Sequence, residues 1–154
     1  MANVAFNKHI SFCEKYMKEL QETFYNLFAK GDTEEAVEYA NNLFRIREEY
    51  TLWLNDEINE KLEAYEKLIR KLGANAHFIK VTRDSSSHVE QRSLFIDNNF
   101  ELFAQLMGMN SNENEIDYDR AIAGAKIKVR EILAIDEITK LRKELVANAV
   151  NKNT

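Results

Sequence analysis

The chain has 154 residues, no proline and only four glycines, whereas average usage would give about eight prolines and eleven glycines. So few turn residues exclude a sandwich or barrel of many short strands, and 45% hydrophobic residues exclude a disordered tail protein. The formal net charge of −5 gives no general attraction to nucleic acid. The composition predicts a single all-α domain, which we place at residues 1–147.

The first predicted helix covers residues 3–30. Its apolar residues follow one another at alternating spacings of four and three, which is the a/d pattern of a heptad repeat. They are Phe6, Ile10, Cys13, Met17, Leu20, Phe24 and Leu27. This stripe predicts coiled-coil-like packing against another helix.

The second predicted helix covers residues 33–72. Asp32 is a good N-cap residue, and Glu35 stands three positions later, where a capping box needs it. About forty residues of helix would span roughly 60 Å, so residues 3–72 are expected to form a long helical hairpin. Three glycines are expected to follow helix ends in the left-handed conformation. They are Gly31, Gly73 and Gly108.

Residues 74–97 are predicted to be an irregular or β-like connection. His77–Thr82 alternates in polarity and is rich in β-branched residues, which is typical of a short strand. One alternative for this region is a β-hairpin that pairs residues 77–83 with residues 88–95.

The favoured alternative is a third helix that begins near His88 and ends by residue 109. Ser87 and Glu90 have the spacing of a capping box, which marks a helix start. On such a helix one face would carry Val89, Ile96, Phe100, Phe103 and Met107.

The last predicted helix covers residues 116–147 and is followed by a flexible tail over residues 148–154. Its apolar pattern has a shortened step between Ile132 and Ile135. Gly124 lies inside this helix, where it costs about 1 kcal/mol against alanine, and it therefore indicates the close approach of another helix. Together the elements predict an antiparallel helical bundle.

Arg83 and His88 form an R-x4-H motif, with Asp84 directly after the arginine. The motif resembles the signature of the HEPN ribonuclease family, whose members are all-helical bundles of similar size that act as dimers. The resemblance implies metal-independent RNA cleavage, in which His88 would handle the 2′-hydroxyl proton and Arg83 would stabilise the phosphate. The alternative interpretation is that both are solvent-exposed loop residues.

No metal or other cofactor is expected. His77, Asp84 and His88 are the nearest approach to a ligand set, but the sequence has no His-x3-His or Glu-x-x-His spacing. The single cysteine, Cys13, excludes an internal disulfide framework. The first residues show no charged and then apolar pattern of a secretory signal, so a cytoplasmic location is expected, and no apolar run is long enough for a membrane span.

Two groups of residues are candidates for a protein interface. Tyr39, Phe44 and Trp53 fall partly outside the main apolar stripe, and an aromatic patch is a usual interface anchor. Ala121, Gly124 and Ala125 form a small-residue patch that would admit a close helix, within the chain or across a symmetry axis.

A basic face on the last helix is the candidate for nucleic-acid binding. Lys126 and Arg130 would lie one turn apart, and an oligomer would repeat such a patch around a ring. Neighbouring acidic residues favour ordinary solvated charge instead.

These observations favour a non-enzymatic, homo-oligomeric interaction or adaptor protein that holds a protein partner with its helix faces. By analogy of size and shape, a viral or mobile-element assembly or regulatory factor would fit. The two alternatives are a HEPN-like ribonuclease and a ring-forming nucleic-acid adaptor.

Overall fold

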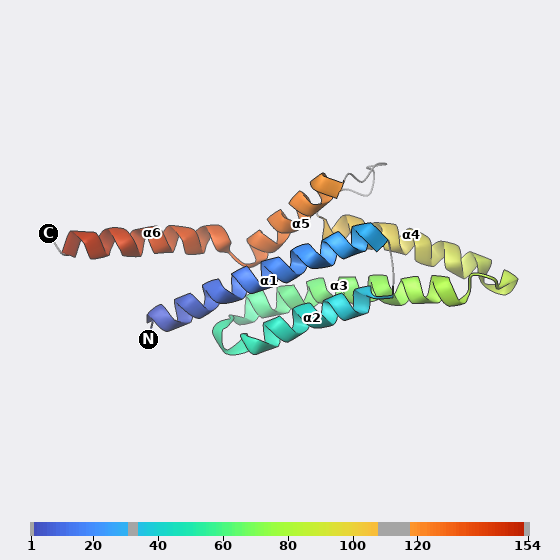
Figure 1. Ribbon diagram of the computed structural model, residues 1–154, viewed down its shortest axis with the longest axis horizontal. Coiled ribbons are helices and arrows are strands. Elements are labelled where there is room, and N and C mark those ends of the chain that lie inside the picture. Colours follow the sequence, from blue (N-terminus) through green and yellow to red (C-terminus); the bar gives the residue numbers. More distant parts are fainter. Residues whose placement is uncertain (1, 31–33, 108–117, 153–154) are drawn as a thin grey trace.

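The computed structural model describes residues 2–30, 34–107 and 118–152, and these ranges contain helices and turns but no strand. The all-α fold class is therefore confirmed (Figure 1). The elements are α1 (Ala2–Lys30), α2 (Ala36–Glu49), the 3-10 turn η1 (Thr51–Trp53), α3 (Asp56–Val81), the 3-10 turn η2 (Ser86–His88), α4 (Val89–Leu106), α5 (Tyr118–Ile132) and α6 (Ile135–Lys152).

The predicted forty-residue helix over 33–72 is wrong, because the chain reverses between α2 and α3. Leu54 is extended, with φ −99° and ψ 141°, and Asn55 begins α3 as an N-cap whose side-chain oxygen accepts a hydrogen bond of 2.8 Å from the amide of Ile58. This reversal packs the apolar faces of α2 and α3 against each other, which buries both. The long hairpin over residues 3–72 is thus replaced by three shorter helices.

Gly73 does not end a helix, and the strand predicted at His77–Thr82 is wrong, because α3 continues to Val81. Gly73 is buried where α3 meets the start of α2, and a Cβ there would lie 2.8 Å from the amide nitrogen of Val37. Close packing, and not a turn, explains this glycine. Gly31 and Gly108 lie outside the described residues.

A turn between α3 and α4 replaces the alternative β-hairpin, and the helix predicted to begin near His88 is confirmed. Arg92 holds this turn together. Its guanidinium donates to the carbonyl oxygen of Thr82, the C-cap of α3, and to that of Ser85 in the turn.

The helix predicted over residues 116–147 is interrupted after Ile132. Ala134 has φ 51°, in the left-handed region, and the chain changes direction there before α6 begins. The interruption falls where the apolar pattern has its shortened step. The flexible tail was predicted from residue 148, and α6 includes that segment as far as Lys152; residues 153 and 154 lie outside the described ranges.

The core is formed by the apolar faces of α1, α2, α3, α4 and α5. Its largest fully buried side chains are Phe12, Tyr16, Leu20, Phe24, Leu27, Leu43, Leu62, Ile69, Leu72, Leu106, Met107 and Leu133. Two polar groups are built into it. Tyr65 donates a 2.8 Å hydrogen bond to the carbonyl oxygen of Leu106, and Arg47 pairs with the fully buried Glu66.

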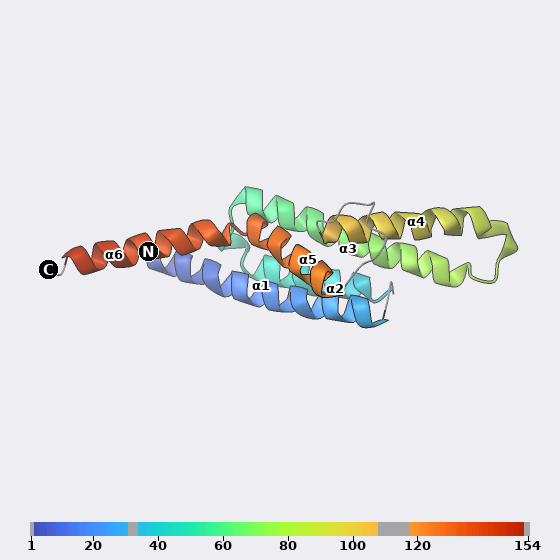
Figure 2. The same ribbon diagram turned by 90° about the horizontal axis from the view of Figure 1, so that it is seen from above.

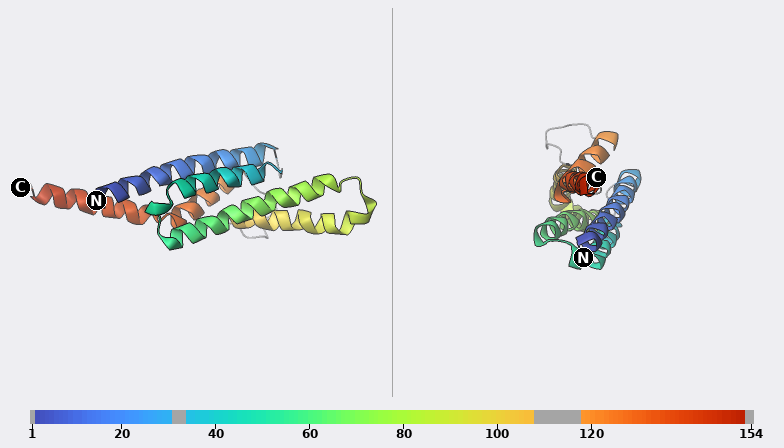
Figure 3. Two further views of the ribbon diagram at one scale, coloured as in Figure 1. Left: turned by 90° about the horizontal axis from the view of Figure 1, so that it is seen from below. Right: turned by 90° about the vertical axis from the view of Figure 1, so that its left-hand side faces the viewer.

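The helices are arranged as an elongated body with an extension at each end (Figures 1 and 2). At one end α3 and α4 continue beyond α1 and α2 as a two-helix arm. At the other end α6 extends away from the body, and Figure 3 shows the same arrangement from below. None of the helices in the described ranges is long and apolar enough to cross a membrane.

Candidate interaction surfaces

The three aromatic residues predicted as an interface do not form one patch. Tyr39 and Phe44 are five positions apart on α2, about 140° around its axis. Tyr39 packs against the core and donates a 2.9 Å hydrogen bond to Glu35. The ring of Phe44 is partly exposed, and the guanidinium carbon of Arg70 lies 5.5 Å from the centre of that ring. Trp53 lies apart from both, partly exposed on η1.

The small-residue patch on α5 is used inside the chain. A Cβ on Gly124 would collide with the carbonyl oxygen of Met107 at the end of α4. Ala125 is buried in the core, and the side chain of Ala121 lies outside the described residues. The close approach predicted at Gly124 is therefore made by α4 of the same chain.

Arg83 and His88 lie near the turn at the tip of the arm, and both are exposed. Nδ1 of His88 lies 2.7 Å from Oγ of Ser85, and the imidazole stands edge-on to Phe78 at 6.2 Å. Arg83 instead lines a groove beside Lys30 and the start of α2. Neither side chain forms a hydrogen bond or ion pair with the other in the described part of the chain.

The candidate metal ligands are also separate. Nδ1 of His77 lies 2.6 Å from a carboxylate oxygen of Glu34, whose other oxygen accepts a 2.6 Å hydrogen bond from Lys80. These contacts lower the pKa of Glu34, chiefly through the Lys80 hydrogen bond. Over residues 2–30, 34–107 and 118–152 there is no group of three acidic, histidine or cysteine side chains that is arranged to hold a metal.

The helix α5, which carries the candidate residues Lys126 and Arg130, has a further lysine that binds it to neighbouring helices. Lys128 donates a 2.5 Å hydrogen bond to the carbonyl oxygen of Gln105, and its ammonium lies 6.0 Å from the ring centre of Tyr65. Lys126 is half-buried and Arg130 is exposed. The positive charge of this helix thus partly serves to hold α5 against α3 and α4.

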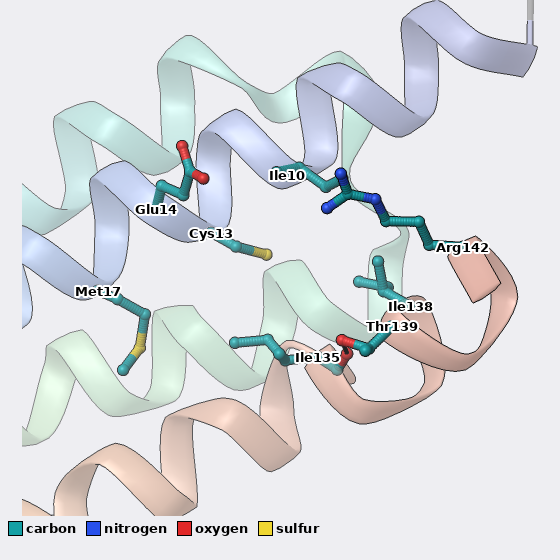
Figure 4. A pocket seen from close by; sticks show the side chains of 8 residues that line it. All are labelled: Ile10, Cys13, Glu14, Met17, Ile135, Ile138, Thr139 and Arg142. Atoms are coloured by element: carbon teal, nitrogen blue, oxygen red, sulfur yellow. Dashed lines mark hydrogen bonds between the residues drawn. The ribbon is translucent and has the colours of Figure 1, made fainter. Parts of the chain in front are cut away.

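An apolar groove of about 240 Å³ separates α1 from the start of α6 (Figure 4). Ile10, Cys13 and Met17 line one wall, and Ile135 and Ile138 line the other. Burial is the main cause that raises the pKa of the Cys13 thiol to about 11, so this side chain behaves as an apolar wall residue and not as a nucleophile.

The outer side of α4 carries an uncovered apolar surface, which we call the α4 flank: Val89, Ile96 and Phe100. It belongs to the face predicted from the sequence, but only the last turns of that face are covered. Phe103 is buried, with its ring 6.3 Å from that of Phe28 on α1, and Met107 is buried against α5. Phe100 remains 64% exposed and Ile96 41% exposed.

A row of carboxylates borders the α4 flank. Glu90, Asp97 and Glu101 are spaced by seven and four residues, so they share one side of the helix. Asp97 is three residues before Phe100, which makes the row a direct neighbour of the apolar surface. All three side chains are exposed and form no ion pair with any described residue.

The second uncovered surface is on α6. We call it the α6 stripe: Ile138, Leu141, Leu145 and Val146, of which Ile138 is half-buried and also lines the groove toward α1. Leu141 is 53% exposed and Leu145 is 51% exposed. All side chains of α6 from Thr139 to Lys152 are exposed, and the main contact of this helix with the rest of the chain is with α5.

A basic residue lies within the α6 stripe. Arg142 is four residues after Ile138 and four before Val146, and it therefore lies between them on the helix surface. Lys143 follows it directly. Arg142 also lines the groove toward α1, together with Glu14 (Figure 4). Neither Arg142 nor Lys143 forms an ion pair with a described residue.

Neither surface was predicted as a docking site. Val89, Ile96 and Phe100 were predicted to share one helix face, but apolar periodicity indicates that a face is buried and not what buries it. The charged residues without ion-pair partners beside each surface were the available signal.

Comparison with known proteins gives no relative. No protein-family model, no curated protein and no solved structure matches the chain. The function must therefore be argued from the geometry of the chain itself.

Proposed function

We propose that this chain is a non-enzymatic helical interaction protein that assembles with itself and holds a protein partner through its uncovered helix faces. The observation that carries the proposal is the exposed amphipathic helix α6. An isolated helix of this length is marginal in water, and most helices in proteins are stabilised by packing of their apolar face. A partner that covers the α6 stripe would supply that packing.

The α4 flank supports the same proposal. Single exposed apolar residues are ordinary on a protein surface, but exposed apolar residues that share one helix face beside a charged border are typical of an interaction site. Here the flank continues a face whose last turns are already packed by α1 and α5. An additional helix placed beside α4 would extend that packing in a coiled-coil-like manner.

Two measurements test the proposal. One is the mass of the native chain in solution, and the other is the capture of a protein partner by matched variants. Light scattering of the native chain should give a mass above that of the 18.0-kDa monomer. A protein partner captured from the native cells should be lost with Leu145→Asp and retained with Leu52→Asp, since Leu52 is an exposed apolar residue on η1, away from both surfaces. A strict monomer that captures the same proteins with both variants would contradict the proposal.

A further inference from the structure

We propose that the chain assembles head to tail, with the α6 stripe of one copy docked on the α4 flank of the next. The inference rests on the proposed function, because it names the partner and the contact through which self-assembly takes place. It follows from three properties of the two surfaces: their positions, their dimensions and their charges.

The two surfaces lie at opposite ends of the molecule. Figures 1 and 2 show α6 extending from one end and the arm of α3 and α4 extending from the other. One copy therefore cannot place its own α6 on its own arm. A contact between two different surfaces of identical chains is heterologous, so it leaves one donor and one acceptor free until a ring closes.

The dimensions of the two surfaces match. The α4 flank extends from Val89 to Phe100, which is about 16 Å at 1.5 Å per residue. The α6 stripe extends from Ile138 to Val146, which is about 12 Å on the same rise.

The charges are complementary. The α4 flank is bordered by Glu90, Asp97 and Glu101, whereas Arg142 interrupts the α6 stripe and Lys143 follows it. From residue 118 to residue 152 basic residues outnumber acidic ones by eight to five, but over residues 1–107 acidic residues outnumber basic ones by 18 to 13. Complementary charge favours the pairing of α6 with α4 of another copy, whereas two α6 helices would bring Arg142 and Lys143 of each copy near like charge.

A complementation experiment tests this contact directly. The donor variant Leu141→Asp/Leu145→Asp loses the α6 stripe, and the acceptor variant Ile96→Asp/Phe100→Asp loses the α4 flank. We expect each variant alone to sediment as a monomer at concentrations where the native chain associates, with the association weakened at least about tenfold. An equimolar mixture should form a 1:1 complex of twice the monomer mass, because one intact donor and one intact acceptor remain.

Charge exchange provides a second test with variants that leave the core untouched, since both residues are exposed. Arg142→Glu and Asp97→Lys should each weaken association, and the mixture of the two should associate more strongly than either alone. Leu52→Asp is the control and should associate like the native chain. Circular dichroism of every variant checks that the helices are retained.

Other outcomes overturn the inference. If the acceptor variant associates like the native chain, the α4 flank is not the docking site. If the donor variant does so, α6 is not the docked helix. If the native chain associates but the two variants do not complement each other, the head-to-tail contact is wrong while the proposed function stands. A native chain that remains monomeric would overturn both.

Discussion

Nε of Arg47 lies 3.0 Å from Oε1 of Glu66, and both side chains are buried between α2 and α3. Tyr16 of α1 donates a 3.1 Å hydrogen bond to the same carboxylate oxygen, and Nη1 of Arg47 donates a 2.7 Å hydrogen bond to Asn59. One charged pair thus joins α1, α2 and α3.

Removal of Arg47 should destabilise the fold strongly. Arg47→Ala leaves the Glu66 carboxylate buried without its counter-ion, and loss of one partner of a buried pair typically costs about 3–5 kcal/mol. Urea unfolding measures the difference. Arg45→Ala, which changes an exposed arginine on the same helix, should change the free energy of unfolding by less than about 0.5 kcal/mol. Equal effects of the two substitutions would contradict the structural role of the pair.

The same carboxylate predicts a pH dependence. Burial raises the pKa of Glu66 above 4.5 and outweighs the opposing hydrogen bonds and charge of Arg47. The folded chain therefore retains this proton at a pH where the unfolded chain has lost it, so this group lowers stability as pH rises from 4.5 toward the folded-state pKa.

Glu66→Gln removes that titration. Relative to this variant, the native chain should lose stability as the pH is raised through that interval, as measured by urea unfolding at a series of pH values. A relative gain in stability of the native chain over the same interval would show that attraction to Arg47 outweighs burial.

Gly124→Ala should destabilise the chain despite the better helix propensity of alanine. The propensity gain is about 1 kcal/mol, but the new methyl group would meet the carbonyl oxygen of Met107, and such overpacking typically costs about 1–3 kcal/mol. Thermal unfolding measures the net change. A rise in the melting temperature would mean that α5 does not approach α4 as closely as described.

Cys13 should react slowly with alkylating agents in the folded chain. Its pKa of about 11, against an ordinary value of 9.0, reduces the thiolate fraction at pH 8 by roughly a hundredfold, and burial adds a steric barrier. Iodoacetamide labelling followed by mass spectrometry compares native protein with protein in urea. Equal rates in the two conditions would contradict the buried placement of this thiol on α1.

The helical class and much of the buried face of α1 were predictable because they depend on local periodicity. The face predicted for α4 is buried only at Phe103 and Met107. The break between Glu49 and Asp56 was not, since the residues around it continue the apolar spacing. Its signal was Asn55, a capping residue followed directly by Asp56 and Glu57, which suit the first turn of a helix. The cost of interrupting the helix is offset by burial of α2 against α3, which is a tertiary effect.

The candidate sites also combine features that local spacing predicts with features that depend on tertiary packing. Gly124 was correctly linked to a close helix approach, because a glycine inside a helix needs a packing reason. That Met107 is its neighbour depends on how α5 crosses α4, and spacing along the chain does not contain that information. Glu66 and Arg47 are 19 positions apart, and each alone resembles an ordinary charged residue on a helix.

The most direct test of head-to-tail assembly is sedimentation of the native chain over a range of concentrations. Because α6 and the α4 flank lie exposed at opposite ends, we expect a weight-average mass that increases with concentration above that of the 18.0-kDa monomer, and that returns toward the monomer value with Leu141→Asp/Leu145→Asp. A mass that stays at the monomer value across the whole range would contradict it.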